Sequence, residues 1–153
     1  MAETRIFIDA DACPVKDEVY KVAWRHNVPV VLVSNSPMRI PEHPLIHRKI
    51  VSDGFDAADD WIVENLNAQS IVITADILLA DRCLKDGAAA VLSPNGKPFT
   101  PDSIGNAVAV RAIMADLRAG AVGQQIGGPP PFSKTDRSRF LSELDKTVVR
   151  LNR

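Results

Sequence analysis

Arg5-Ile6-Phe7-Ile8-Asp9 is a short apolar run that ends in an acid. Its length and its β-branched and aromatic side chains predict a buried strand. Pro14 suits the first turn of a helix, with Cys13 at the cap position before it. We therefore expect this strand to lead directly into a helix that ends near His26.

The alternation of strand and helix continues along the chain. Four further apolar runs predict strands, at 29–33, 45–51, 70–74 and 88–92. Helical periodicity predicts four more helices, at about 57–67, 77–85, 104–118 and 134–151. Because strands and helices alternate as far as residue 92, we expect a three-layer α/β fold. In that fold, helices cover both faces of a mostly parallel five-stranded sheet.

The length of 153 residues corresponds to one domain. The segment 120–131 contains three glycines after Gly120 and three consecutive prolines, a composition that predicts a linker or an irregular loop. Ser133 follows it and is a suitable residue to open the last helix. We therefore expect a single domain over 1–153, in which segment 120–131 leads into a C-terminal helix.

Composition argues against several classes of protein. The two cysteines are too few for a disulfide framework, and no apolar run approaches the length of a membrane span. The N-terminal residues lack a secretory signal pattern, so we expect a cytoplasmic protein without a membrane partner. The net charge is −1, divided as −5 over 1–110 and +4 over 111–153. This division fits either solvated helix faces or an acidic metal site beside a surface that contacts phosphates.

Acidic side chains follow two of the predicted strands. Asp9 and Asp11 lie where the first strand ends, and Asp76 lies two residues after the strand at 70–74. In open parallel sheets, ligands bind outside the carboxyl ends of the strands. The three carboxylates therefore converge if these two strands are neighbours. Asp is disfavoured in strands, so two such residues at a strand end favour a functional role.

A second group of acids, Asp56, Asp59 and Asp60, has the spacing of one helix side and precedes the strand at 70–74. Clustered carboxylates repel one another unless a cation compensates, and Mg²⁺ or Mn²⁺ with oxygen ligands does so. Metal-assisted hydrolysis of a phosphodiester is the chemistry that such a cluster favours. The alternative is structural: Asp76 caps the helix that follows it, and the second group complements a helix dipole.

Other polar residues are candidates for contact with substrate. Ser34 and Asn35 follow the second strand and either contact a phosphate or start a turn. Arg39 either attracts a polyanion or lies on an ordinary solvated surface. Cys13 is interpreted as a small capping residue, because the arginine of a cysteine phosphate-binding loop does not follow it.

Four segments together resemble the bacterial YaiI/YqxD family of uncharacterised proteins, from about residue 5 to the last helix. They are IDADACPVK at 8–16, GFDAADD at 54–60, ITADILLA at 73–80 and GGPPPF at 127–132. That family is grouped with PIN-like domains, whose fold is a parallel sheet with helices on both sides. The resemblance therefore implies a nuclease that cuts RNA or single-stranded nucleic acid with Mg²⁺ or Mn²⁺.

The resemblance also implies roles for individual residues. Asp9, Asp59 and Asp76 correspond to the metal-binding acids, with Asp60 as the alternative to Asp59 and Asp11 close by. A further acid of such nucleases has no secure match, and Asp81 is the nearest candidate. Of the basic run expected near 117–120, only Arg118 is charged here, which weakens the implied RNA contact at that position.

Two other functions fit the sequence. A phosphatase of the haloacid-dehalogenase type would use Asp9 as nucleophile and Asp11 as general acid, with Ser34 at the phosphate. Against it, the chain offers no obvious cap domain and no clearly placed lysine before Asp76. A non-catalytic PIN-like module would keep the fold and bind metal or nucleic acid without turnover, which the near-neutral charge supports.

Overall fold

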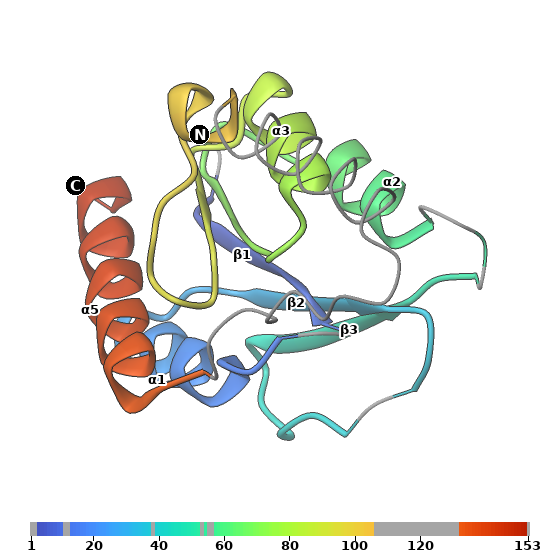
Figure 1. Ribbon diagram of the computed structural model, residues 1–153. Helices are drawn as coiled ribbons and strands as arrows, with labels where there is room; N and C mark the ends of the chain where they lie inside the picture. The colour runs from blue at the N-terminus through green and yellow to red at the C-terminus, as the bar shows by residue number, and fades with distance from the viewer. Residues whose placement is uncertain are drawn as a thin grey trace, which may run out of the picture.

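The computed structural model of the chain describes residues 3–10, 13–37, 39–52, 54, 57–105 and 132–152. Five strands form one sheet in the order β3-β2-β1-β4-β5, and every neighbouring pair is parallel (Figure 1). Their bounds are β1 Arg5–Asp9, β2 Val30–Ser34, β3 Ile46–Ile50, β4 Ser70–Ile73 and β5 Ala90–Leu92. The predicted parallel five-stranded sheet is confirmed.

Four helices are described over their full length. They are α1 Lys16–His26, α2 Ala57–Glu64, α3 Ile77–Lys85 and α5 Lys134–Leu151. Residues 101–105 are also helical, and the remainder of the helix expected at 104–118 lies outside the described residues, as does segment 120–131. None of the described helices combines the length and apolarity that a membrane span requires.

The sheet is buried on both faces, because successive side chains of a strand point to opposite sides. Ile6 and Ile8 belong to the core cluster that α1 and α5 cover. Phe7 belongs to a second cluster, under α2 and α3. Figure 1 shows the two helical layers on opposite sides of the sheet. The three-layer α/β architecture is therefore confirmed.

The C-terminal helix is the most fully predicted element. Ser133 is its N-cap and forms a capping box with Asp136, in which each side chain bonds the other residue's backbone N–H. Phe140, Leu144 and Val148 recur at helical spacing and are completely buried against the sheet and α1. The cap contributes about 1 kcal/mol, and the buried stripe holds the helix in place.

The start of α1 differs from the prediction. The helix begins at Lys16, its N-cap is Val15, and no side chain caps it, so Cys13 is not the capping residue. Val15 is completely buried in the core, which fixes the turn before the helix.

The end of α2 also differs from the prediction. The helix stops at Glu64 rather than near residue 67. The Asn65 side chain donates a hydrogen bond to the Trp61 carbonyl at 2.7 Å and occupies an acceptor at the helix end. Asn competes with the helical backbone for hydrogen bonds in this way, so the chain turns early towards β4.

The strand order creates a switch point beside β1. The chain adds β2 and β3 on one side of β1 and then crosses to the other side for β4 and β5. Ile8 pairs in register with Ile73, so Asp9 and Thr74 follow at the same level of the sheet. Ligands of open parallel sheets bind at such a point, outside the carboxyl ends of the strands.

Candidate active site at the carboxyl edge of the sheet

The ends of β1 and β4 are joined by side chains. Thr74 Oγ1 donates a hydrogen bond to Asp9 Oδ2 at 2.9 Å and accepts one from the backbone N–H of Asp76 at 3.0 Å. Thr74 is buried, whereas Asp9 and Asp76 are partly buried. The hydroxyl therefore orients the first carboxylate and fixes the backbone that carries the second.

Asp76 is the N-cap of α3, as the structural alternative predicted. Its Oδ1 accepts from the backbone N–H groups of Leu78 at 2.9 Å and Leu79 at 3.4 Å. The capping bonds use one carboxylate oxygen, so Oδ2 takes no part in them. Capping and cation binding are therefore compatible roles for this side chain.

Asp9 and Asp76 line one cavity of about 250 Å³ at the switch point. Its other described lining residues are Cys13, Ile73, Thr74, Ala75 and Pro94. Burial raises the pKa of the Cys13 thiol, and the negative charge of Asp9 acts in the same direction. The thiol therefore stays protonated near neutral pH and is a poor nucleophile. The predicted convergence of acids from β1 and from the residues after β4 is observed for Asp9 and Asp76.

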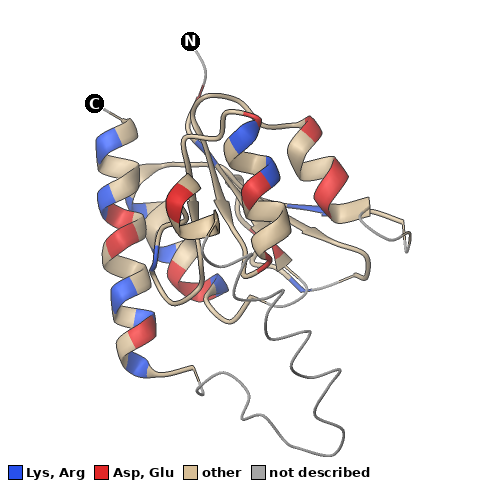
Figure 2. Ribbon diagram, turned by 45° about the horizontal axis from the view of Figure 1, so that its top comes forward, with Lys and Arg blue, Asp and Glu red and all other residues tan. Residues whose placement is uncertain are grey.

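The acids of α2 lie at a different place. Asp60 Oδ1 forms an ion pair with Arg82 Nη2 of α3 at 2.9 Å, and both side chains are about half exposed. Figure 2 shows acidic segments on α2 and segments of both signs on α3. Asp60 is therefore held by a neighbouring helix on the outer surface. Both predicted α2 ligands lie in the first helical turn, as the helix-dipole alternative requires.

Asp59 is half-buried on α2. The pKa of the Cys83 thiol is raised to about 12, chiefly by burial and further by the charges of Asp59, Asp86 and Asp9. Asp59 and Asp9 therefore act on the same buried thiol from two different elements. Among the described residues that line the 250 Å³ cavity, however, Asp59 is absent.

The expected substrate-contacting residues are dispersed. Ser34 is buried and donates its hydroxyl to the Ser36 carbonyl at 2.5 Å, which is the turn alternative. Asn35 is exposed after β2, and Arg39 lines a separate hollow of about 410 Å³ beside β3. Asp11 and Arg118 lie outside the described residues.

The described residues provide only part of a metal site. Within them, no group of three or more His, Cys, Asp or Glu side chains is placed to hold a metal ion. Asp9 and Asp76 provide two carboxylates at one cavity. Mg²⁺ is commonly bound by one or two carboxylates, with water and substrate phosphates completing its octahedron. This donor set therefore fits a hard cation that shares its coordination with substrate.

Thr74 is the residue of this site that was not identified from the sequence. The sequence contains a signal for this role, because Thr74 lies at a strand end two residues before Asp76, where its hydroxyl is suited to a local hydrogen bond. Its bond to Asp9 spans 65 positions and depends on the pairing of β1 with β4. That pairing was open at the level of the sequence.

Comparison with known proteins identifies close relatives. The family model described as "Uncharacterized BCR, YaiI/YqxD family" matches residues 7–150. A "UPF0178 protein" of Sphingopyxis alaskensis is 68% identical over 153 residues, covering 100% of this chain and 98% of the relative. A "UPF0178 protein" of Rhodopseudomonas palustris strain TIE-1 is 59% identical over 152 residues, covering 99% and 94%. No solved structure matches the chain significantly.

Proposed function

The chain belongs to the YaiI/YqxD family, and we propose that it is a Mg²⁺- or Mn²⁺-dependent nuclease acting on RNA or single-stranded DNA. One observation carries the proposal: Asp9 and Asp76, from the ends of neighbouring parallel strands, line the same cavity at the switch point. Two carboxylates in one small cavity repel each other unless a cation compensates. The PIN-like architecture expected from the sequence is compatible with this sheet.

The roles of the residues follow from their contacts. Asp9 and Asp76 would hold the cation, which supplies Lewis-acid stabilisation of phosphate charge and a more acidic bound water. Thr74 orients Asp9 through the 2.9 Å hydrogen bond. Asp76 keeps its place through the α3 cap. Asp60 is paired with Arg82 on the outer surface, and it remains, with Asp11 and Asp59, a candidate to complete the ligand set.

Hydrolysis requires no nucleophilic side chain. The oxygen of water would form a new bond to phosphorus as the water loses a proton, the phosphodiester P–O bond would break, and the leaving alkoxide would take up a proton. Burial raises the pKa of the Cys13 thiol, which makes it a weak nucleophile. This protonated thiol and the apolar side chains of Ile73 and Pro94 form the remaining wall of the cavity.

A non-catalytic module that binds metal or nucleic acid is the second candidate. It is favoured by the absence, among the described side chains, of a complete three-ligand group. The two candidates differ in turnover. A metal-dependent rise in melting temperature without any cleavage would favour the binding module.

The deciding experiment is cleavage of labelled single-stranded RNA and DNA with Mg²⁺ or Mn²⁺. Wild type is compared with Asp9→Asn, which keeps a hydrogen-bond acceptor for Thr74 and removes the charge. Asp86→Asn is the matched control, because Asp86 is exposed at the other end of α3. We expect metal-dependent cleavage by wild type and by the control, and its loss in Asp9→Asn. Equal cleavage by all three proteins would contradict the proposal.

A further inference from the structure

A second, larger hollow adjoins the cavity of Asp9 and Asp76. Its volume is about 720 Å³, and it shares the wall residues Ala75 and Pro94 with the smaller cavity. Its other walls come from the residues after β5, from Ser103 and from the start of α5. We call it the α5 groove and define it by Ser93, Asn95, Lys97, Phe99, Phe132 and Arg139. The volume lies within the range of small-molecule sites.

The wall after β5 is a rigid turn that is pressed against α5. Ser93 N–H donates to the Lys97 carbonyl and Gly96 N–H to the Ser93 carbonyl, each at 3.0 Å. Gly96 has a φ of 86°, and a Cβ on it would lie 2.6 Å from the backbone nitrogen of Phe140. The groove is therefore formed by two elements whose backbones pack closely against each other.

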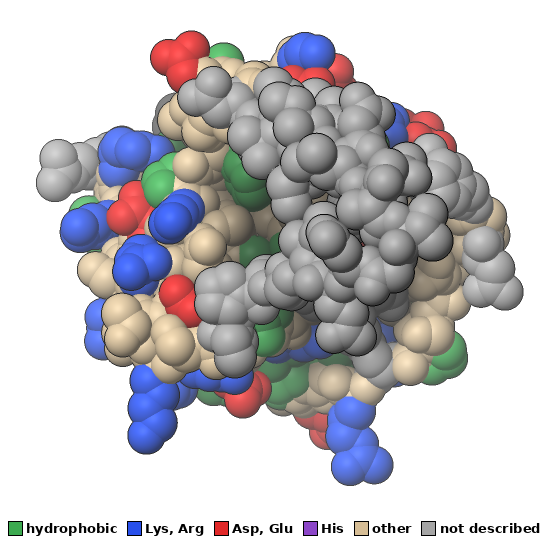
Figure 3. Space-filling model, viewed as in Figure 1, with side chains coloured by type: hydrophobic (Ala, Val, Ile, Leu, Met, Phe, Trp, Pro, Cys, Tyr) green, Lys and Arg blue, Asp and Glu red, His purple; other side chains and the backbone are tan. Residues whose placement is uncertain are grey.

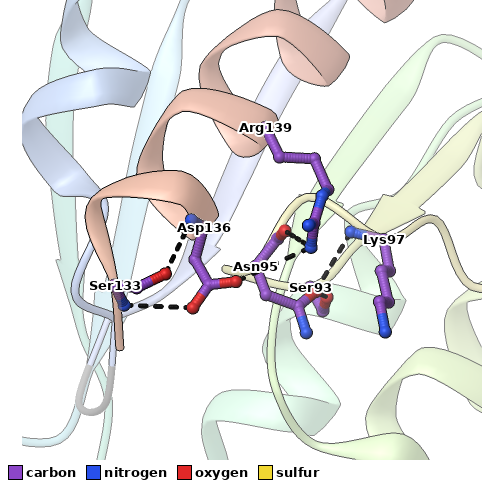
Figure 4. Close-up of polar contacts among 6 residues, drawn as sticks. All are labelled: Ser93, Asn95, Lys97, Ser133, Asp136 and Arg139. Atoms are coloured by element: carbon purple, nitrogen blue, oxygen red, sulfur yellow. Dashed lines mark hydrogen bonds and ion pairs between the residues drawn. The ribbon is translucent and has the colours of Figure 1, made fainter. Parts of the chain in front are cut away.

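The side chains on this wall are held by specific contacts (Figure 4). Arg139 Nη1 donates to the Asn95 carbonyl at 3.4 Å and lies 3.6 Å from Asp136 Oδ1. The other oxygen of Asp136 accepts the Ser133 backbone N–H of the capping box at 3.0 Å. Asn95 Oδ1 accepts the backbone N–H of Lys97 at 3.1 Å. The Arg139 guanidinium is thus oriented, whereas the Lys97 side chain is exposed.

The charge of the groove favours an anion. Lys97 and Arg139 outnumber Asp136, which is the single carboxylate among the described lining residues of the groove. Figure 3 shows further Lys and Arg side chains gathered over α5 on the same face, with fewer acids between them. The neighbouring cavity has the opposite character, because Asp9 and Asp76 line it. A phosphate in the cavity would be repelled by the two carboxylates, whereas a phosphate in the adjoining groove would be stabilised by Lys97 and Arg139.

The groove also contains aromatic surface. Phe99 and Phe132 both line it and are only partly buried. The Arg137 guanidinium lies 4.9 Å from the Phe132 ring centre and donates to the Pro14 carbonyl at 2.8 Å, in the turn before α1. Proteins bind single-stranded nucleic acids with aromatic rings beside cations, because the bases stack on the rings and the phosphates pair with the cations.

We propose that the α5 groove binds one nucleotide of a single-stranded nucleic acid, next to the phosphate that occupies the cavity of Asp9 and Asp76. This inference rests on the proposed nuclease function for its substrate class. Lys97 and Arg139 contact the phosphate of the bound nucleotide, and Phe99 contacts its base. The side-chain NH₂ of Asn95 is the hydrogen-bond donor for the sugar or the base edge, because the Ser93 and Ser103 hydroxyls are bonded to Asn95 Oδ1 and to the Thr100 backbone.

Binding without catalysis tests the groove directly. We would measure fluorescence anisotropy of labelled single-stranded hexanucleotides, RNA and DNA, with wild-type protein in chelator, over a range of salt concentrations. Lys97→Gln removes a cation whose side chain is exposed. Lys146→Gln is the matched control, because Lys146 is exposed on α5 outside the described groove lining. We expect Lys97→Gln to weaken binding about fivefold and to reduce the slope of log K against log salt by about 0.7.

A second variant tests the base contact. Phe99→Leu keeps an apolar side chain and should weaken binding of the hexanucleotide by about fivefold, while an abasic chain of the same length binds both proteins equally. No measurable binding by wild type overturns the inference, as does an equal affinity and salt slope for the two lysine variants. These results are independent of the cleavage assay. If wild type binds the hexanucleotide but cleaves nothing, only the nuclease proposal is contradicted. If wild type cleaves and Lys97→Gln binds as tightly as wild type, only the groove proposal is contradicted.

Discussion

Thr74 Oγ1 lies 2.9 Å from Asp9 Oδ2 and donates a hydrogen bond to it across the pair β1 and β4. The same hydroxyl accepts the backbone N–H of Asp76 at 3.0 Å. One buried side chain therefore positions both carboxylates that line the 250 Å³ cavity. The geometry of the proposed site depends on Thr74 although Thr74 is not expected to bind the cation.

Thr74→Val tests this dependence. The substitution keeps the volume and removes the hydroxyl, which leaves Asp9 without this donor. We expect a loss of about 1–2 kcal/mol in the free energy of unfolding, measured by urea denaturation. Cleavage should fall roughly 10–100-fold, as for residues that orient metal ligands. Thr74→Ser should restore cleavage; if it does not, the hydroxyl is not the group that matters.

Gly96→Ala tests the contact between the turn after β5 and α5. A Cβ would lie 2.6 Å from the backbone nitrogen of Phe140 and 2.7 Å from the carbonyl carbon of Arg139, and the φ of 86° is unfavourable for Ala. We expect a destabilisation of about 2–5 kcal/mol, the sum of backbone strain and overpacking.

Gly87→Ala is the control for that substitution. Gly87 has a similar φ of 92°, but its added Cβ would meet nothing within 4 Å. It should report the backbone strain alone, about 1–2 kcal/mol. Equal melting temperatures for the two variants would show that the turn does not pack on α5 as described.

The two thiols should react slowly in the folded protein. Burial is the main cause of the raised pKa of both thiols. It raises the pKa of Cys13, and it raises the pKa of Cys83 to about 12. The thiolate fraction of Cys83 near pH 8 is then about a thousandfold below that of an ordinary cysteine. Iodoacetamide labelling, followed by mass spectrometry, should be slow in buffer and fast in urea. Rapid labelling of Cys83 in buffer would contradict its burial.

The contact between α1 and α5 should respond to acid. Asp145 Oδ1 lies 2.7 Å from His26 Nε2 and 3.4 Å from Arg25 Nη1. The hydrogen bond with His26, followed by the charges of His26 and Arg25, lowers the pKa of Asp145. A lowered folded-state pKa stabilises the protein above the unfolded value, near 3.9, and this stabilisation is lost as the pH falls through the folded value.

Asp145→Asn should therefore destabilise the protein at pH 7 and have less effect as the pH falls below about 3.9. The difference at pH 7 should stay under about 1 kcal/mol, because the carboxylate is about a third exposed and screened by solvent. Urea denaturation of both proteins at several pH values measures it. A difference that grows in acid would show that the sign of the linkage is wrong.

The sequence predicts the fold well because the fold depends on local patterns. The run predicted at 29–33 forms β2, of which all residues but Val31 are buried, and Ser133 caps a helix whose buried stripe has regular spacing. The convergence of Asp9 and Asp76 was predicted on the condition that β1 and β4 are neighbours, and the structure meets that condition.

Contacts between distant segments were not predictable from local patterns. The bond of Arg139 to Asn95 spans 44 positions, and the pair of Arg82 with Asp60 spans 22. The first joins the two walls of the α5 groove, and the second pairs Asp60 with a cation on the outer surface. The start of α1 was misplaced for a related reason, because the burial of Val15 in the core decides where the helix begins.

The most direct test of the central claim is the cleavage rate of a labelled single-stranded RNA, with Mg²⁺ or Mn²⁺, by wild type and by Asp76→Asn. Asn is as good an N-cap as Asp, so α3 and the melting temperature should be retained. A cation site that includes Asp76 predicts metal-dependent cleavage by wild type and a loss of at least about a hundredfold in the variant. Cleavage by Asp76→Asn at the wild-type rate, or none by wild type with either metal, would contradict it.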